Sequence, residues 1–243
     1  MGDVSIEMVI LVSGVIFLAA SLQGVTGFGF NLLAVPPLII LFPAQVVVPG
    51  LIVLFPALGF AQVIQLWHKV DRGLLAWWTV SSLIALPFGA LILGNTDTQT
   101  MQKSIGAVMI VLALILQMKP GAPLQRERTA RAFTGFLAGG LAASTAVSGP
   151  PLVLLGLKQR YETHRFRATL IAYFLAVSLL CMPFHWQMDL LNAESVWFAV
   201  SGFPGLVLGF FSGTWLRQHV EGQIFRWIAI AMVLLGGIVA ILL

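Results

Sequence analysis

The sequence contains very little charge for its length. Only 9% of its 243 residues are Asp, Glu, Lys or Arg, whereas 59% are hydrophobic, and the mean hydropathy is +0.98. Soluble domains carry about 25% charged residues, so this composition excludes an ordinary soluble globular protein. The net charge of +4 arises from short loops between apolar runs, and we therefore expect no nucleic-acid partner.

Cysteine is almost absent too. Cys181 is the single cysteine, which excludes an intramolecular disulfide and a cysteine-based zinc site, and we expect no metal and no cofactor. The N-terminal apolar run 9–20 lacks the basic flank of a signal peptide, because Asp3 and Glu7 precede it and the first basic residue is Lys69. We interpret this run as a retained helix.

The chain has instead a series of apolar runs about 20 residues long, the length with which a helix crosses a bilayer. Hydropathy predicts six full-length spans, at about 46–67, 74–94, 103–118, 168–186, 195–216 and 225–243. Two further apolar segments, 5–43 and 130–157, are interrupted by glycines, hydroxyl residues and a Pro-Pro pair. We predict an all-α polytopic membrane protein.

Basic residues are concentrated in four loops, and cytoplasmic loops carry the excess of positive charge in membrane proteins. The four groups are Lys69 and Arg72; Lys119, Arg126, Arg128 and Arg131; Lys158, Arg160, Arg165 and Arg167; and Arg217 and Arg226. We expect these loops in the cytoplasm. The N-terminus and the loops 95–102 and 187–194 are poor in basic residues, so we expect them outside.

The segment 130–157 lies between two basic loops, so both of its ends belong on one side. Two crossings need about 40 residues, whereas 26 residues separate Arg131 from Lys158. A re-entrant hairpin solves this, and the same interpretation makes 5–43 a hairpin that enters from outside. Each half then has a re-entrant or broken helical hairpin plus three transmembrane helices, which predicts two inverted-topology repeats, 1–118 and 119–243.

Matching landmarks support this repeat. Pro36-Pro37 matches Pro150-Pro151, Asp71 matches Asp189, and Leu86-Pro87 resembles Phe203-Pro204. The alternative is that apolar helices resemble one another by chance.

The two interrupted segments are the candidate binding site. In lipid, a break in a helix survives only where it lines a cavity or packs against protein. The candidate substrate-binding residues are Thr26, Gly27, Phe28, Gly29, Phe30 and Asn31 in the first break and Ser144, Thr145, Ser148 and Gly149 in the second. Away from their ends, the predicted spans contain no charged residue, so backbone N–H groups and positive helix-dipole ends would hold a ligand, which favours an anion.

Several of these residues have a second interpretation. We expect Asn31 and Ser148 to be N-caps or direct ligands, and each Pro-Pro pair to open a return arm. The glycines could simply permit close helix packing, and the hydroxyls could bond to carbonyls of their own helix. Other polar residues also allow more than one interpretation. Gln23, Gln62 and Gln65 are interhelical contacts or ligands. We expect His68 and His185 to be interfacial anchors, with proton coupling as an alternative for His185.

The glycine-rich break followed by Pro-Pro, its partner Ser148-Gly-Pro-Pro151 and the run Pro204-Gly205-Leu-Val-Leu-Gly209 resemble the TauE/SafE family of sulfite and organosulfonate exporters. The resemblance covers nearly the whole chain. It implies a secondary transporter that exports small anions, such as sulfite, sulfoacetate or related sulfonates and carboxylates, across the bacterial inner membrane. The run 143–147 departs from the family pattern, because it has hydroxyl residues where more glycine is usual.

Two other functions fit some of these residues. A passive anion channel would need the same opposed half-helix ends. An intramembrane serine protease would use Ser148 as nucleophile with His185 downstream, although a serine nucleophile needs a base within hydrogen-bond reach. The sequence leaves the particular anion, the coupling ion, the direction of transport and the oligomeric state undetermined.

Overall fold

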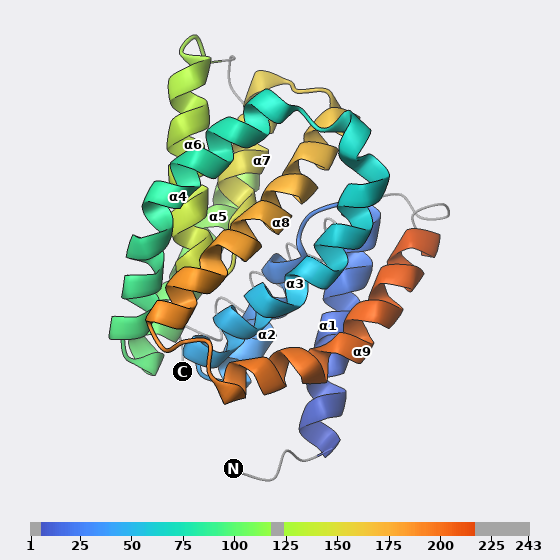
Figure 1. Ribbon diagram of the computed structural model, residues 1–243, viewed down its shortest axis with the longest axis vertical. Helices are drawn as coiled ribbons and strands as arrows, with labels where there is room; N and C mark the ends of the chain where they lie inside the picture. The colour runs from blue at the N-terminus through green and yellow to red at the C-terminus, as the bar shows by residue number, and fades with distance from the viewer. Residues whose placement is uncertain (1–5, 118–123, 217–243) are drawn as a thin grey trace.

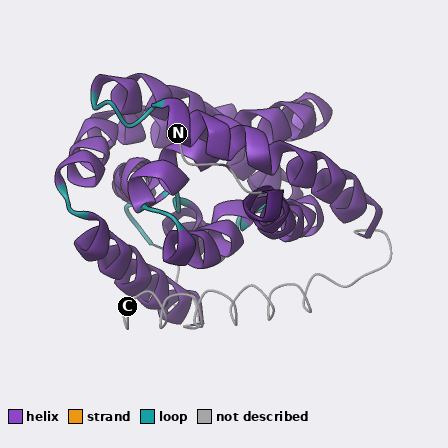
Figure 2. Ribbon diagram, turned by 90° about the horizontal axis from the view of Figure 1, so that it is seen from below, coloured by secondary structure: helices purple, strands orange, loops and turns teal. Residues whose placement is uncertain are grey.

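The computed structural model describes residues 6–117 and 124–216, and short loops join the helices that make up nearly all of this part (Figures 1 and 2). The helices are α1 (Ile6–Thr26), α2 (Phe30–Leu41), α3 (Ala44–Leu66), α4 (Arg72–Asn95), α5 (Thr98–Gln117), α6 (Glu127–Thr145), α7 (Gly149–Gln159), α8 (Thr163–Gln187) and α9 (Ala193–Leu216), with a 3₁₀ turn η1 (Trp67–Lys69) after α3. The predicted span 225–243 lies outside the described residues.

Five of these helices are long and apolar enough to cross a membrane, by length and composition. They are α1, α3 together with η1, α4, α8 and α9. Large apolar side chains remain exposed on α4 and α9, among them Phe88, Ile92, Phe203 and Phe211, as expected where lipid rather than water is the solvent. The all-α polytopic fold class is therefore confirmed.

The predicted hairpin segments each contain a longer helix followed by a short one. In the second, the 19 residues of α6 precede the 11 of α7, and both outer ends meet: the Leu124 N–H donates to Gln159 Oε1 at 3.2 Å, and Gln159 Nε2 donates to the Leu124 carbonyl at 3.1 Å. In the first, α1 has 21 residues, a rise of about 31 Å. That is enough for a complete crossing, so α1 is more than a half-length arm.

Glycines let the long helix of each hairpin pack closely along a span of the other half. Gly205, Gly209 and Gly213 of α9 face the backbone of α1, where a side chain would overlap the carbonyls of Ser13, Phe17 and Ser21. Gly135 and Gly139 of α6 meet Trp78 and Ser82 of α4 in the same way. In each case the long helix of one hairpin packs on the second span that follows the other hairpin: α1 on α9, and α6 on α4. Such reciprocal packing is what two repeats would produce, and the inverted repeat itself stays a prediction.

Two landmarks used for the repeat do not occupy matching positions. Pro36 and Pro37 lie inside α2, which begins at Phe30, so the expectation that they open the return arm is wrong. Pro150 and Pro151 do lie in the first turn of α7. The reason is that α2 starts where Gly29 takes a left-handed conformation, φ 100°, well before its prolines.

The second mismatch concerns the caps of α4 and α9. Asp71 caps α4, because its carboxylate accepts from the Leu74 N–H at 2.9 Å. The residue with this role in α9 is Asn192, whose Oδ1 accepts from the Ser195 N–H at 3.0 Å. Asp189 instead lies in the loop after α8 with φ 55°. The equivalent of Asp71 is therefore Asn192.

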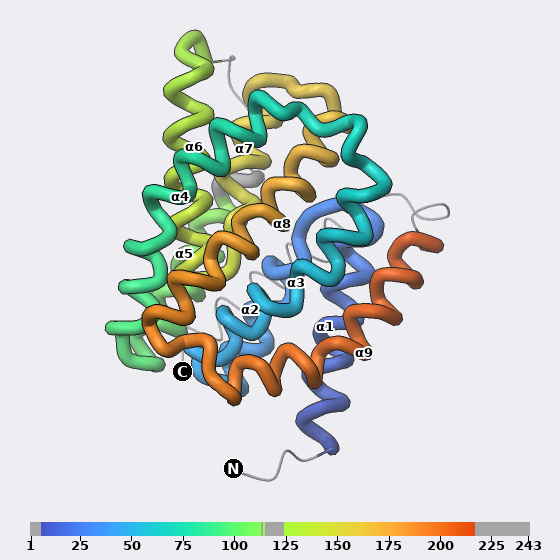
Figure 3. The backbone as a smooth tube through the Cα atoms, in the orientation of Figure 1, coloured from blue at the N-terminus to red at the C-terminus, as the bar shows by residue number. Residues whose placement is uncertain are grey.

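The loops divide between the two ends of the molecule. The η1–α4 loop, the start of α6 and the α7–α8 loop carry most of the described basic residues and lie together at the top of Figure 1. The start of α1 and the α4–α5 and α8–α9 loops lie at the bottom. The path of the backbone places α2 and α7 in the interior between them, with most of their residues buried (Figure 3). Which end faces the cytoplasm stays a prediction.

Candidate functional site

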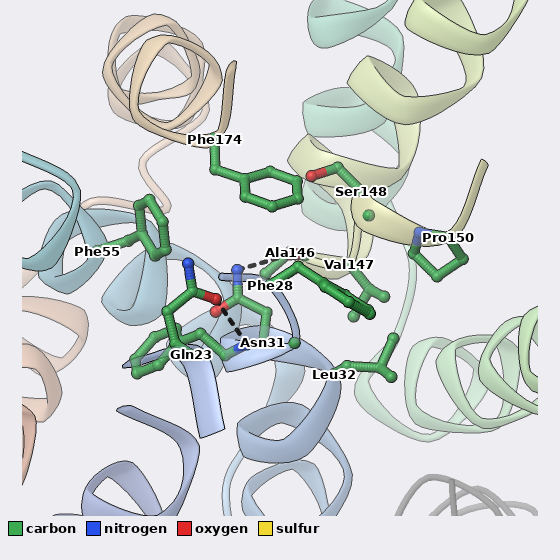
Figure 4. A pocket seen from close by; sticks show the side chains of 13 residues that line it. Gln23, Phe28, Asn31, Leu32, Phe55, Ala146, Val147, Ser148, Pro150 and Phe174 are labelled. Atoms are coloured by element: carbon green, nitrogen blue, oxygen red, sulfur yellow. Dashed lines mark hydrogen bonds between the residues drawn. The ribbon is translucent and has the colours of Figure 1, made fainter. Parts of the chain in front are cut away.

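The two breaks meet around a small cavity of about 30 Å³ (Figure 4). It is lined by Gln23, Phe28, Gly29, Phe30, Asn31, Leu32 and Phe55 from the first half and Ala146, Val147, Ser148, Gly149, Pro150 and Phe174 from the second. One hydrogen bond joins the breaks directly, because Asn31 Nδ2 donates to the carbonyl of Ala146 at 2.7 Å. Segments far apart in the sequence thus line a single cavity.

The first break is shaped by two left-handed glycines and a buried glutamine. Gly27 and Gly29 have φ of 84° and 100°, a conformation that glycine adopts without steric cost. Gln23 holds the turn from inside. Its Nε2 donates to the Gly27 carbonyl at 3.1 Å and to Gln62 Oε1 at 3.3 Å, and its Oε1 accepts from the Phe30 N–H at 3.3 Å. Gln23 and Gln62 are therefore in interhelical contact, and Gln23 also lines the cavity.

The second break has fewer backbone donors. α6 ends at Thr145, and the next residue, Ala146, takes a left-handed conformation, φ 60°. Ser148 occupies the N-cap position of α7 without a side-chain bond to that helix. The N–H groups of a first helical turn have no partner inside the helix. Pro150 and Pro151 have no N–H, so Gly149 is the residue of this turn that can offer one.

Two phenylalanines from the long helices form an apolar wall. Phe55 of α3 and Phe174 of α8 pack edge to face, with ring centroids 6.2 Å apart, and Phe30 lies 5.8 Å from Phe55. Sequence reasoning missed Phe55 and Phe174, since a single aromatic residue within an apolar run carries no signal of its own.

Six of the ten predicted site residues line the cavity: Phe28, Gly29, Phe30, Asn31, Ser148 and Gly149. The other four do not. The hydroxyls of Thr26, Ser144 and Thr145 each donate to the carbonyl four residues earlier in their own helix, at 2.8 Å in all three cases, which is the alternative interpretation of these residues. Gly27 packs beneath the Arg167 side chain of α8. Asn31 is not an N-cap, because the residue in that position is Gly29.

Arg167 is a cationic side chain that reaches the first break. Its Nη2 donates to the carbonyl of Gly24 at 3.0 Å, and its side chain covers Gly27 so closely that a Cβ there would overlap it. A positive charge at the C-terminal carbonyls of α1 is electrostatically favourable. Sequence reasoning treated Arg167 as a loop residue, whereas α8 begins at Thr163 and carries Arg167 inward.

His185 is not an interfacial anchor, because it is fully buried. Its Nε2 lies 2.8 Å from the carbonyl oxygen of Ala143. A carbonyl can only accept, so Nε2 carries the hydrogen. Nδ1 is then the basic nitrogen, and it is buried without a hydrogen-bond partner among the described residues, so Ser148 is not bonded to the base that a serine protease needs.

The ends of the second hairpin segment carry a small polar cluster. Glu127 pairs with Arg131 at 2.7 Å and accepts from the Tyr161 hydroxyl at 2.6 Å. The Tyr161 and Arg131 bonds hold the pKa of the Glu127 carboxyl below its ordinary value. Burial, with Glu127 nearby, raises the pKa of Tyr161 to about 12.

Comparison with known proteins identifies one family. The family model described as "Sulfite exporter TauE/SafE" matches residues 12–240, which is nearly the whole chain. No curated protein and no solved structure matches the chain.

Proposed function

The chain belongs to the sulfite exporter TauE/SafE family, and we propose that it is a secondary transporter that exports sulfite or a small organosulfonate through the cavity between its two breaks. The family is one of membrane transporters rather than enzymes. The observation that carries the proposal is the meeting of the α2 and α7 starts at one cavity, with Asn31 bonded across to Ala146.

The chemistry of the lining supports an anionic substrate. None of the described residues that line the cavity is charged, so the N-terminal ends of α2 and α7, with N–H groups that have no partner within the helix and with positive dipole ends, would supply the attraction. Each hydrogen bond to a charged group contributes about 1.5–3 kcal/mol net. A few such bonds offset much of the desolvation cost of an oxyanion, while Phe55 and Phe174 suit the organic part of a sulfonate.

The size of the cavity supports a carrier over a channel. Its volume of about 30 Å³ has room for about two water molecules, which is less than the four heavy atoms of sulfite need, so sulfite enters only if the surrounding helices separate. The Asn31–Ala146 bond links the two halves across the site, and we propose that alternating access breaks it. A passive channel would instead need a continuous wider path.

Counterflow in proteoliposomes tests this function. Vesicles loaded with unlabelled sulfite should take up ³⁵S-labelled sulfite faster than empty ones, and uptake should saturate. Protein-free liposomes are the control. Uptake without trans-stimulation would indicate a channel, and absence of any sulfite or sulfonate flux would reject the proposal.

A further inference from the structure

The orientation of the Asn31 amide is determined by its bond across the cavity. Nδ2 faces the carbonyl of Ala146 at 2.7 Å, and the flipped amide would place two acceptor oxygens against each other. Oδ1 therefore points away from Ala146. It is buried, and no group in residues 6–117 or 124–216 donates a hydrogen bond to it.

The neighbouring polar side chains do not supply a hydrogen-bond donor to Asn31 Oδ1. The Nε2 group of Gln23, in the same cavity, already donates to the Gly27 carbonyl and to Gln62 Oε1. Asn31 itself lines both this cavity and an adjoining one of about 20 Å³ formed with α3 and α8. A buried acceptor without a donor costs free energy, and such exceptions mark places where a ligand or water completes the bonding.

The site thus combines donors for an anion with an unpaired acceptor, Asn31 Oδ1. An alkyl sulfonate would use the backbone N–H groups but leave Asn31 Oδ1 unpaired. We propose that the site selects anions that carry an O–H or N–H donor close to the anionic group, such as hydroxysulfonates, aminosulfonates or singly protonated sulfite, with Asn31 Oδ1 as the acceptor. This inference rests on the proposed function and names the substrate class of the same site.

Two sulfonates of nearly equal size test it. In 2-hydroxyethanesulfonate a hydroxyl replaces the terminal methyl of 1-propanesulfonate, so the pair differs mainly in the donor. Competition with labelled sulfite uptake in proteoliposomes should show the hydroxysulfonate to be about 10-fold more effective, because a site built to bond a hydroxyl rejects the analogue without one. Equal inhibition by the two compounds overturns the inference.

A variant tests the assignment to Asn31. Asn31→Leu keeps the side-chain size and removes the acceptor, so the two sulfonates should inhibit sulfite uptake by this variant equally. The matched control Gln65→Leu removes an exposed amide of α3 and should retain the preference. A preference that persists in Asn31→Leu, or in Asn31→Ala should the leucine variant not fold, assigns the acceptor elsewhere and overturns the proposal.

A failure of this inference can be distinguished from a failure of the proposed function. If sulfite is transported but neither sulfonate competes, the selection for a donor is rejected and the exporter function stands. If the protein transports no sulfur oxyanion, the proposed function fails first.

Discussion

The guanidinium of Arg167 donates a 3.0 Å hydrogen bond to the carbonyl oxygen of Gly24, three residues before Gly27. This contact brings a positive charge from α8 to the first break, whose residues Phe28 and Gly29 line the cavity, and the described residues of that lining carry no charge. Because the surroundings are apolar, that charge would act on an anion in the cavity over a longer distance than it would in water.

Arg167→Gln should therefore weaken anion binding. We expect the Kd for sulfite to rise about 10-fold, equivalent to ~1.4 kcal/mol, as measured by isothermal titration of detergent-solubilised protein. Arg165→Gln is the matched control, since its exposed side chain lies two residues earlier on the same helix. Equal losses in both variants would show that only the charge of the loop matters.

Gly29→Leu should abolish transport. Gly29 has φ 100° and lines the cavity, so leucine would strain the backbone and occupy the space that the anion needs. Gly14→Leu is the control, because an added Cβ on that exposed glycine meets nothing within 4 Å. Proteoliposome uptake measures both. Normal uptake by Gly29→Leu, with the fold retained, would remove the first break from the site.

Ser148→Ala should reduce transport without ending it. The hydroxyl is one donor among several at the cavity, so its loss should cost about 1–2 kcal/mol of binding, and higher substrate concentration should restore flux. A nucleophilic serine would behave differently, since its removal ends covalent chemistry at any concentration. Cleavage of a membrane-helix substrate that depends on Ser148 would contradict the transporter.

The cluster at Glu127 predicts a pH-dependent stability. Its pKa in the folded protein lies below the ordinary 4.5, so the cluster stabilises the fold above that pH and the contribution is lost as the pH falls further. Tyr161→Phe should lower the melting temperature at pH 7, by an amount equivalent to under about 1 kcal/mol for this partly exposed cluster. The difference from the parent should shrink near pH 3. A difference that is the same at both pH values would argue against the linkage.

Thiol labelling of intact cells tests the orientation. In a Cys181→Ser background, single cysteines at Thr98 and Asn192 should react with an impermeant reagent, and those at Gln125 and Glu162 should not. All four positions are exposed, so access depends on the side of the membrane. Reaction at Glu162 but not at Gln125 would place the two ends of the segment 130–157 on opposite sides.

The sequence alone determined the solvent of this protein and the position of its breaks. Scarce charge and long apolar runs leave only a membrane as the surroundings, and the all-helical polytopic fold follows. The breaks were identifiable because glycine and proline act on the backbone locally, whatever packs around them.

Only the tertiary structure decided which residues of the breaks line the cavity. Ser144 and Ser148 are the same residue type four positions apart, yet Ser144 bonds to its own helix and Ser148 lines the cavity. Phe174 lines the cavity and Arg167 contacts the first break, and both belong to α8, a helix that contains no break. The physical reason is that a side chain's surroundings depend on how its helix is rotated and which helices pack against it, and those long-range contacts leave no local pattern in the sequence.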